Sequence, residues 1–351
     1  METILDNYQK IYSMLEDDLS KDIFLNRLCY LISNDFRFIK RIIPPSLVCG
    51  EHYIFWDEVL SGIPATSKIV LYGAGDYSKD YFPEWSKDKR IIGFCSNNKK
   101  KQETGYLGYP VMSPEELSVQ KEYYVIVSAV KEKPKREILA HLKEINYPAD
   151  KIYSLFEREA EQGQYFDTDF MEYSNQEIFI DAGCYHLENT IELEKRCKVK
   201  KVYAFEPDPD NYQVCLERKE QLGMEEVKVF QCGTWSEKTW LHFAVRGTDG
   251  THITENREAI SIPVAAIDET VEPDDKVTFI KMDVEGAELE SLRGCKRTIK
   301  KYRPKLAICI YHRPEDMIQI PIYIKELVPE YRLYIRHHSN CAWETVLYAM
   351  P

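Results

Sequence analysis

Apolar and polar positions divide the chain into stretches with different periodicities. Apolar residues first recur at helical spacing, over 4–15 and again over 23–32. Pro44 and Pro45 should end the second helix, because proline supplies no backbone donor and restricts the residue before it. From Lys68 onwards, short apolar runs alternate with mixed segments. This pattern predicts helices first and then α/β structure with buried parallel strands.

The apolar runs 68–72, 90–95 and 123–129 predict three strands of a small Rossmann-like unit. The first run continues into a glycine turn and helix at 73–78 (GAGDYS), a motif of low specificity. A NAD site would require an acidic side chain at the end of the second strand. This chain has Ser96-Asn97-Asn98 there, which argues against NAD.

Two runs in the C-terminal half are more informative. Residues 178–183 (IFIDAG) predict a buried strand that turns tightly into a helix, and 202–206 (VYAFE) predict the next strand, which ends at Glu206. The carboxyl ends of adjacent parallel strands face one crevice. The 25 residues from Asp181 to Glu206 are close to the roughly 20 expected between a nucleotide-binding turn and the carboxylate that holds ribose hydroxyls. The spacing predicts a cofactor that contains adenosine.

The composition of the first turn distinguishes between adenosine cofactors. A dinucleotide site requires Gly-x-Gly-x-x-Gly, so that a pyrophosphate can approach the backbone. Here the turn has one glycine, Gly183, and Asp181 places a negative charge where phosphate would lie. That charge suits the sulfonium and ammonium groups of S-adenosylmethionine. The turn favours this methyl donor over NAD, and an ordinary strand–turn–helix corner would carry the same short motif.

Two further motifs follow. Residues 277–294 contain a strand, the block 280–288 (IKMDVEGAE) and a helix, and another strand runs into Tyr311-His312. Together these motifs resemble the FkbM family of S-adenosylmethionine-dependent methyltransferases, over roughly residues 165–351. The resemblance implies a class I methyltransferase fold, an α/β fold whose seven-stranded, mostly parallel sheet has one antiparallel strand near its C-terminal edge. The family usually has a second glycine in the first turn, where this chain has His186-Leu187-Glu188.

Methyl transfer to a hydroxyl oxygen requires alignment of donor and acceptor and removal of the hydroxyl proton. His312 is the predicted base, because it directly follows a strand at the carboxyl edge of the sheet and the family resemblance supports the role. Asp283 and Glu285 end the neighbouring strand and could hold the donor, orient His312 or coordinate a divalent ion. We predict no metal, since Asp-x-Glu alone is weak evidence for one. The predicted catalytic residues are His312 and Asp283, and the predicted cofactor-binding residues are Asp181, Gly183, Glu206, Asp283 and Glu285.

Several other segments have expected roles. The loop 232–236 is placed to meet the adenine, and the alternating segments 239–245 and 260–267 predict a hairpin. The loop between them, 247–258, is a candidate substrate lid. The charged stretch 156–164 is the expected linker. We expect His337-His338 to form an exposed turn rather than to line the acceptor pocket.

Composition narrows the class of partner. A net charge of −12 weighs against nucleic acid, because binding phosphate backbones relies on clustered lysine and arginine. The ten cysteines contain no Cys-x-x-Cys pair, which fits reduced thiols. The N-terminus lacks the order of a signal peptide, and no apolar stretch reaches the ~18 residues of a membrane span. We therefore expect a cytoplasmic protein that binds neither nucleic acid nor a membrane.

These observations predict three segments: a helical lead-in over 1–62, a Rossmann-like accessory domain over 63–157 and an FkbM-like methyltransferase domain over 165–351. The accessory domain is similar, through 93–117, to the N-terminal domain of nucleotide-sugar acyltransferases. The predicted activity is S-adenosylmethionine-dependent O-methylation of a small molecule or saccharide. The alternatives are an NAD(P)- or sugar-nucleotide-dependent oxidoreductase or epimerase that uses 73–78, and a non-catalytic binding protein with a decayed methyltransferase fold. The oligomeric state stays open, with a homodimer as one option.

Overall fold

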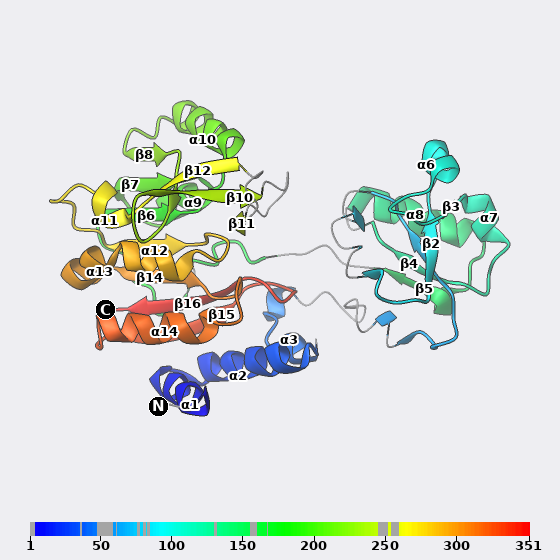
Figure 1. Ribbon diagram of the computed structural model, residues 1–351, viewed down its shortest axis with the longest axis horizontal. Coiled ribbons are helices and arrows are strands. Elements are labelled where there is room, and N and C mark those ends of the chain that lie inside the picture. The colour runs from blue at the N-terminus through cyan, green and yellow to red at the C-terminus, as the bar shows by residue number, and fades with distance from the viewer. Residues whose placement is uncertain are drawn as a thin grey trace. The chain divides into compact units, whose positions relative to one another are not determined.

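The chain folds into two compact units, one made of Met1–Leu47 and Ala160–Pro351 and the other of Val48–Glu159 (Figure 1). The helices at the start of the chain therefore belong to the same unit as the C-terminal half. This computed structural model describes residues 4–35, 37–47, 59–60, 62–75, 78–79, 82, 85–129, 132–154, 160–166, 168–244, 252–253 and 260–351.

The large unit is built on a seven-stranded sheet with the strand order β15-β16-β14-β13-β6-β7-β8. Neighbouring strands are parallel except at β16, which runs antiparallel to both β14 and β15. The predicted class I methyltransferase sheet is thereby confirmed. Its strands are β6 (Glu177–Ala182), β7 (Val199–Phe205), β8 (Val227–Phe230), β13 (Phe279–Met282), β14 (Lys305–Cys309), β15 (Arg332–His337) and β16 (Thr345–Met350).

Burial of the central strands explains why their sequences are apolar without alternation. Every residue of β6, β13, β14 and β16 is buried. On one face, Phe179 of β6 and Phe279 of β13 lie with ring centroids 5.2 Å apart, and Phe166 packs on both rings. Complete burial of such a side chain contributes about 1.5–3 kcal/mol. This packing fixes the strand ends that carry the acidic residues.

Helices cover the sheet, and the residues at both ends of α10 suit the start and the end of a helix. Before α10, Asp208 caps the first turn by accepting from the amides of Asp210 and Asn211, Pro209 occupies the first position, and Gly223 ends the helix with φ 65°. The helices around the sheet are α9 (Glu188–Glu194), α10 (Pro209–Leu222), α11 (Ile267–Thr270), α12 (Glu288–Gly294), α13 (Lys296–Tyr302) and α14 (Asp316–Leu327).

The N-terminal helices lie at the β15 edge of this sheet, where α2 packs against β15 and α1 contacts α14 (Figure 1). They are α1 (Ile4–Met14), α2 (Asp18–Ser33) and α3 (Arg37–Lys40), followed by a 3-10 turn over Pro45–Leu47. The hydroxyl of Ser20 accepts the backbone N–H of Ile335 at 2.9 Å, and Asp17 forms a 2.6 Å ion pair with Arg336. These contacts satisfy an edge strand that would otherwise expose backbone groups.

A four-stranded sheet beside the main one has the order β11-β10-β12-β9. The predicted hairpin is confirmed by the antiparallel pair β10 (Thr239–Ala244) and β12 (Ile260–Ala265). The shorter strands are β9 (Gly233–Thr234) and β11 (His252–Ile253). Apart from β11, the predicted lid 247–258 lies outside the described residues.

The small unit has a five-stranded parallel sheet of order β3-β2-β1-β4-β5, as expected for a Rossmann-like unit. In the motif 73–78, the Gly73 carbonyl accepts the hydroxyls of Ser78 and Ser128, while Asp76 and Tyr77 lie outside the described residues. The elements are β1 (Ile69–Tyr72), β2 (Ile91–Cys95), α6 (Lys99–Thr104), β3 (Val111–Met112), α7 (Pro114–Ser118), β4 (Tyr124–Val127), α8 (Glu132–Glu144), a 3-10 turn (Ala149–Lys151) and β5 (Ile152–Ser154).

Among the helices of the described residues, none is both long enough and apolar enough to cross a membrane.

The architecture predicts how the chain can be shortened. Ser46 donates a hydrogen bond to Glu161, so the chain leaves and re-enters the large unit at neighbouring points. Replacing Val48–Glu159 with a short glycine–serine linker should leave the large unit folded. A chain that starts at residue 165 lacks α1 and α2, so it should melt at least about 4 °C lower. Circular dichroism melting of the two shortened chains checks both expectations. Equal melting temperatures of the linker-containing chain and the chain that starts at residue 165 would contradict the edge-covering role of the helices.

Candidate active site

A cavity of about 770 Å³ lies at the carboxyl edge of the seven-stranded sheet. The ends of β6, β7 and β13 meet there, and the strand order reverses between β6 and β13, which is where open α/β sheets bind ligands. Gly183, Glu206, Asp283 and Glu285 line the cavity, as the sequence predicts for a shared crevice. Gly233 and Thr234, from the loop expected to meet adenine, line it as well.

A wider hollow of about 960 Å³ lies in the small unit, at the amino ends of β1 and β2. Its lining includes Arg90, whose guanidinium is occupied by Asp88 and by the backbone carbonyl of Leu60. It lies at the ends of the strands opposite to the glycine turn, and its described side chains Asp88 and Arg90 are paired with each other. The cavity of the large unit is therefore the candidate site.

The wall of this cavity is strongly acidic. Its carboxylates far outnumber its lysines, and such a surplus of one charge favours a cationic occupant. The acidic residues are Glu161, Glu188, Glu192, Glu206, Asp208, Asp210, Asp283 and Glu285, and the lysines are Lys195 and Lys281.

Asp181 lies beneath the cavity rather than on its wall. Its side chain is 0 % exposed, accepts the Thr190 hydroxyl at 2.8 Å and lies 3.4 Å from Nζ of Lys281. Lys281 in turn donates to the Gly183 carbonyl at 2.6 Å and lines the cavity. Burial raises the pKa of Asp181, against the lowering effect of Lys281. The expected direct contact of Asp181 with the donor does not match this geometry, in which Asp181 supports the turn through Lys281.

The turn at Gly183 depends on close backbone packing. Gly183 has φ 75°, and a Cβ there would lie 1.8 Å from the Asp283 carbonyl oxygen. Two residues further on, Tyr185 and then Leu187 also adopt left-handed conformations, with φ 52° and 61°. Leu187 thus has a backbone conformation that favours glycine, although its side chain is buried. The missing second glycine therefore leaves a tight turn in place, at a cost of about 1–2 kcal/mol per strained residue.

Backbone donors hold Glu206 at the end of β7. Its Oε1 accepts the N–H of Asp208 and its Oε2 accepts the N–H of Tyr185, both at 2.9 Å. Burial raises the pKa of this carboxyl to about 7. A buried carboxylate fixed at the cavity wall is suited to accept hydrogen bonds from a ligand diol, which is the predicted ribose contact.

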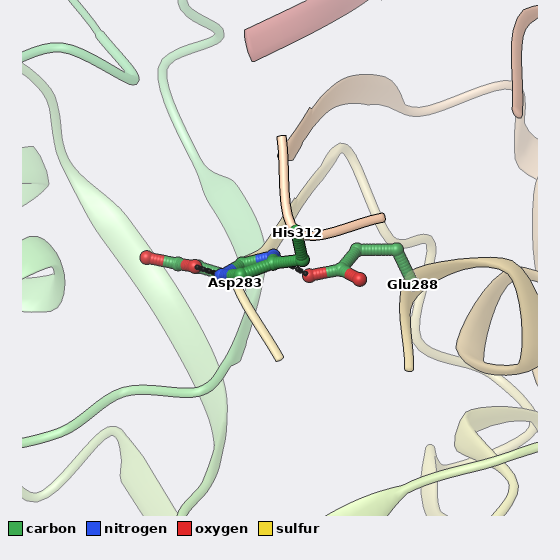
Figure 2. A group of neighbouring side chains, drawn as sticks. All are labelled: Asp283, Glu288 and His312. Carbon is green, nitrogen blue, oxygen red and sulfur yellow. Dashed lines mark ion pairs between the residues drawn. The ribbon is translucent and has the colours of Figure 1, made fainter. Parts of the chain in front are cut away.

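His312 lies between carboxylates just beyond the end of β14 (Figure 2). Its Nδ1 is 2.8 Å from Oε1 of Glu288, and its Nε2 is 3.5 Å from Asp283 Oδ1 and from Glu285 Oε2. Burial alone would lower the pKa of His312, but these three carboxylates outweigh it and raise the pKa to about 10. At neutral pH the free protein therefore carries an imidazolium here.

Asp283 is held by aromatic hydroxyls. Tyr165 donates to its Oδ2 at 2.9 Å, and Tyr311 donates to its Oδ1 at 3.3 Å. Burial would raise the pKa of Asp283, yet the charges of Lys281 and His312 overcome it, so the pKa is lowered. Tyr311 also lies 3.3 Å from Glu344, whose pKa burial raises to about 7.

Sequence reasoning missed several of these partners. Tyr165 lies 118 positions before Asp283, so no local spacing connects them. Glu344 reaches the cluster only because β16 pairs with β14. A local signal did exist for Lys281, which stands two positions before Asp283 in the most specific motif of the chain.

A metal ion would meet an unsuitable arrangement at the group formed by Asp283, Glu288 and His312. Asp283, Glu288 and His312 bring donor atoms within 4.8 Å of one another. However, Glu288 and Asp283 contact opposite nitrogens of the ring (Figure 2). One ion coordinated by a single ring nitrogen would have to displace one of these contacts. The geometry favours a row of charged groups, with the imidazole between two carboxylates, over the coordination of a metal ion.

Two expectations require correction. Residues 160–164, expected to be linker, belong to the large unit and line the cavity. His337 and His338 do not form an exposed turn, since both are buried. His338 contacts Glu161 at 2.9 Å and the Tyr348 hydroxyl at 2.7 Å, and so fastens the segment that forms one cavity wall.

Comparisons with known proteins agree with this architecture. Residues 181–340 match the model of the methyltransferase FkbM domain, and residues 65–153 match the model described as C2185-like, N-terminal. The large unit therefore carries an FkbM methyltransferase domain, and the chain is an S-adenosylmethionine-dependent methyltransferase. The resemblance of the small unit to nucleotide-sugar acyltransferases stays a prediction. No curated protein sequence matches the chain significantly.

One solved structure shares the fold at low identity, and two others match with lower TM-scores. The methyltransferase FkbM from Methylobacillus flagellatus is 19% identical with a TM-score of 0.59, and the match covers 94% of this chain and 99% of that one. An rRNA methylase from Streptococcus thermophilus is 17% identical over 50% of this chain and 86% of that one, with a TM-score of 0.34. TrmK of M. capricolum, solved with S-adenosyl-homocysteine, is 11% identical over 50% of this chain and 62% of that one, with a TM-score of 0.30.

The site predicts a specific effect of Glu206→Ala on donor affinity. Hydrogen bonds to a charged group contribute about 1.5–3 kcal/mol, so S-adenosylmethionine should bind roughly ten-fold more weakly, as measured by calorimetry. Glu217→Ala, an exposed glutamate on α10, is the control. Because the pKa of Glu206 is about 7, wild-type affinity should also weaken as the pH falls below that value. An unchanged affinity in folded Glu206→Ala would remove the ribose assignment.

Proposed function

We propose that this enzyme transfers the methyl group of S-adenosylmethionine to a hydroxyl oxygen of a small molecule or saccharide. The observation that carries the proposal is His312, a buried imidazole that directs Nε2 toward two cavity carboxylates, Asp283 and Glu285. A base in this place is required for methylation of an alcohol, whose proton must leave as the new bond forms.

The residues of the cavity fit the donor. The acidic wall suits a molecule with a positive charge, and the Gly183 turn leaves no space for a side chain beside Asp283. Glu206 would accept the ribose hydroxyls, and Gly233 and Thr234 would border the adenine. S-adenosylmethionine supplies an electrophilic methyl group on its sulfonium.

The protonation state of His312 couples donor binding to base catalysis. In the free protein its pKa of about 10 keeps the ring charged at neutral pH. A cation bound beside Asp283 and Glu285 competes with the imidazolium for the same carboxylates, and like charges disfavour one another. The pKa of His312 should therefore fall when the donor binds. Nε2 is then free to accept the hydroxyl proton of the acceptor.

The same wall constrains the acceptor. Glu285 is 40 % exposed at the cavity, and its carboxylate accepts hydrogen bonds from hydroxyl groups. Phosphate or carboxylate groups on the acceptor would be repelled by the surplus of acidic residues. An uncharged polyol or saccharide fits this environment best.

The oxidoreductase and epimerase alternatives find little support in the small unit. The Gly73 carbonyl is occupied by the hydroxyls of Ser78 and Ser128, and β2 is followed by Ser96 rather than by an acid. A purely non-catalytic protein would have no need of the charged arrangement around His312. Methyl transfer is therefore the activity that the site supports best.

A transfer assay tests the proposal. With 13C-methyl-labelled S-adenosylmethionine and a panel of neutral saccharides and polyols, the label should appear in an alkali-stable methyl ether, identified by NMR. His312→Asn should slow turnover by on the order of 10²-fold or more and leave donor affinity unchanged or higher. His141→Asn, the same substitution in the small unit, is the control.

Three outcomes would contradict the assignment. Label on nitrogen, or in an alkali-labile ester, would exclude a hydroxyl acceptor. Full activity of His312→Asn would show that the histidine is not the base. Loss of activity with EDTA that Mg²⁺ restores would assign the charged cluster to metal-assisted chemistry instead.

A further inference from the structure

Glu288 lies at the start of α12 and is firmly held. Its side chain is 0 % exposed. Its Oε1 accepts the backbone N–H of Val284 at 2.9 Å, which fixes the carboxylate relative to the loop that carries Asp283 and Glu285. The other oxygen, Oε2, makes no hydrogen bond within the described part of the chain. A buried carboxylate with an unused oxygen requires a nearby positive or donor group.

The ring of His312 lies beside this carboxylate, with Nδ1 close to Oε1 rather than to Oε2, in a charge contact and not in a hydrogen bond of good geometry. Nδ1 lies 2.8 Å from Glu288 Oε1, while Nε2 lies on the opposite side of the ring, 3.5 Å from Asp283 Oδ1 (Figure 2). The side chain of His312 is 11 % exposed, so little water reaches Nδ1 to replace this contact. Glu288 and the cavity carboxylates therefore face different nitrogens.

The position of the proton on a neutral imidazole depends on such contacts. A neutral ring carries one proton, and the partner of one nitrogen decides which nitrogen holds it. A carboxylate beside Nδ1 keeps the proton there and leaves the lone pair on Nε2. Without that carboxylate, the proton could occupy Nε2, and the nitrogen facing the cavity could no longer accept a proton.

We propose that Glu288 is a positioning residue that holds His312 as the Nδ1–H tautomer, with the accepting nitrogen Nε2 turned toward the cavity. The proposal rests on the function proposed above and adds a residue for which sequence reasoning gave no catalytic role. Neither Glu288 nor His312 lines the cavity itself. His312 faces the lining carboxylates Asp283 and Glu285, and Glu288 would act on the reaction through His312.

Other charged groups also surround this histidine and set its charge. Asp283 and Glu285 face Nε2 from the loop after β13, and Lys281 lies close to Asp283. From β16, Glu344 interacts electrostatically with His312. Asp316, at the start of α14, interacts electrostatically with His312 and with the neighbouring Arg313. These groups alter the affinity of the ring for a proton, whereas Glu288 contacts Nδ1 and thereby decides where the proton lies.

NMR of 15N-histidine-labelled protein tests the proposal without an acceptor. His312→Asn identifies the signals of this ring, and the two nitrogens report both its tautomer and its titration. Glu288→Gln removes the charge and keeps the size of the side chain. The apparent pKa of His312 should fall by at least about one pH unit, and the neutral ring should become a mixture of both tautomers.

Two matched variants separate position from charge. Glu290→Gln removes a carboxylate that is paired with Arg293 on the same helix, and should change neither property. Glu285→Gln removes a carboxylate on the Nε2 side, so it should lower the pKa of His312 but preserve the Nδ1–H tautomer. An unaltered tautomer in folded Glu288→Gln would overturn the proposal.

If Glu288→Gln does not fold, Glu288→Asp tests the proposal instead. It retains the charge, so the Nδ1–H tautomer should persist, and a mixture of tautomers in this variant would count against the positioning role. The result is independent of the assay for methyl transfer. Full activity of His312→Asn would contradict the role of His312 as the base. The NMR signals would still show whether Glu288 sets the tautomer of the ring.

Discussion

The balance of buried charge around the carboxyl edge of the sheet is the constraint on which this site depends. The cavity wall has many carboxylates, and two buried cations hold them in place. Lys281 connects Asp181 to the Gly183 turn, and His312 lies among Asp283, Glu285 and Glu288. Loss of one partner from a buried pair typically costs about 3–5 kcal/mol, because the remaining charge is left uncompensated. The geometry of the turn and of the cluster around His312 thus follows from electrostatics as much as from apolar packing.

This balance also distinguishes the two forms of the cofactor. A sulfonium donor adds a positive charge to an acidic cavity, whereas the thioether that remains after transfer has lost that charge. The cavity should therefore hold the substrate form of the cofactor better than the product form. In the proposed mechanism, the same change would release the carboxylates to pair again with the imidazolium, which would reset His312 after each turnover.

The sequence predicted those features that depend on local pattern. Apolar runs ending in Glu206 and Asp283 identified parallel strands whose ends share a crevice, and the structure places both residues on the cavity wall. The features that the sequence did not predict depend on tertiary contacts. Asp181 is buried because Thr190 and Lys281 satisfy it from neighbouring elements. The packing of α2 on β15 joins segments more than 300 positions apart, which no local pattern reveals.

Calorimetric measurement of proton release on cofactor binding tests the charge-balance account most directly. At pH 9, carboxyls with a pKa of about 7 are already ionised, while His312, with a pKa of about 10, is still mostly protonated. Titrations in buffers of different ionisation enthalpy should show that S-adenosylmethionine releases a proton, that neutral S-adenosylhomocysteine releases clearly less, and that His312→Asn abolishes the difference. Equal proton release for the two cofactor forms, or release unaffected by His312→Asn, would contradict the account.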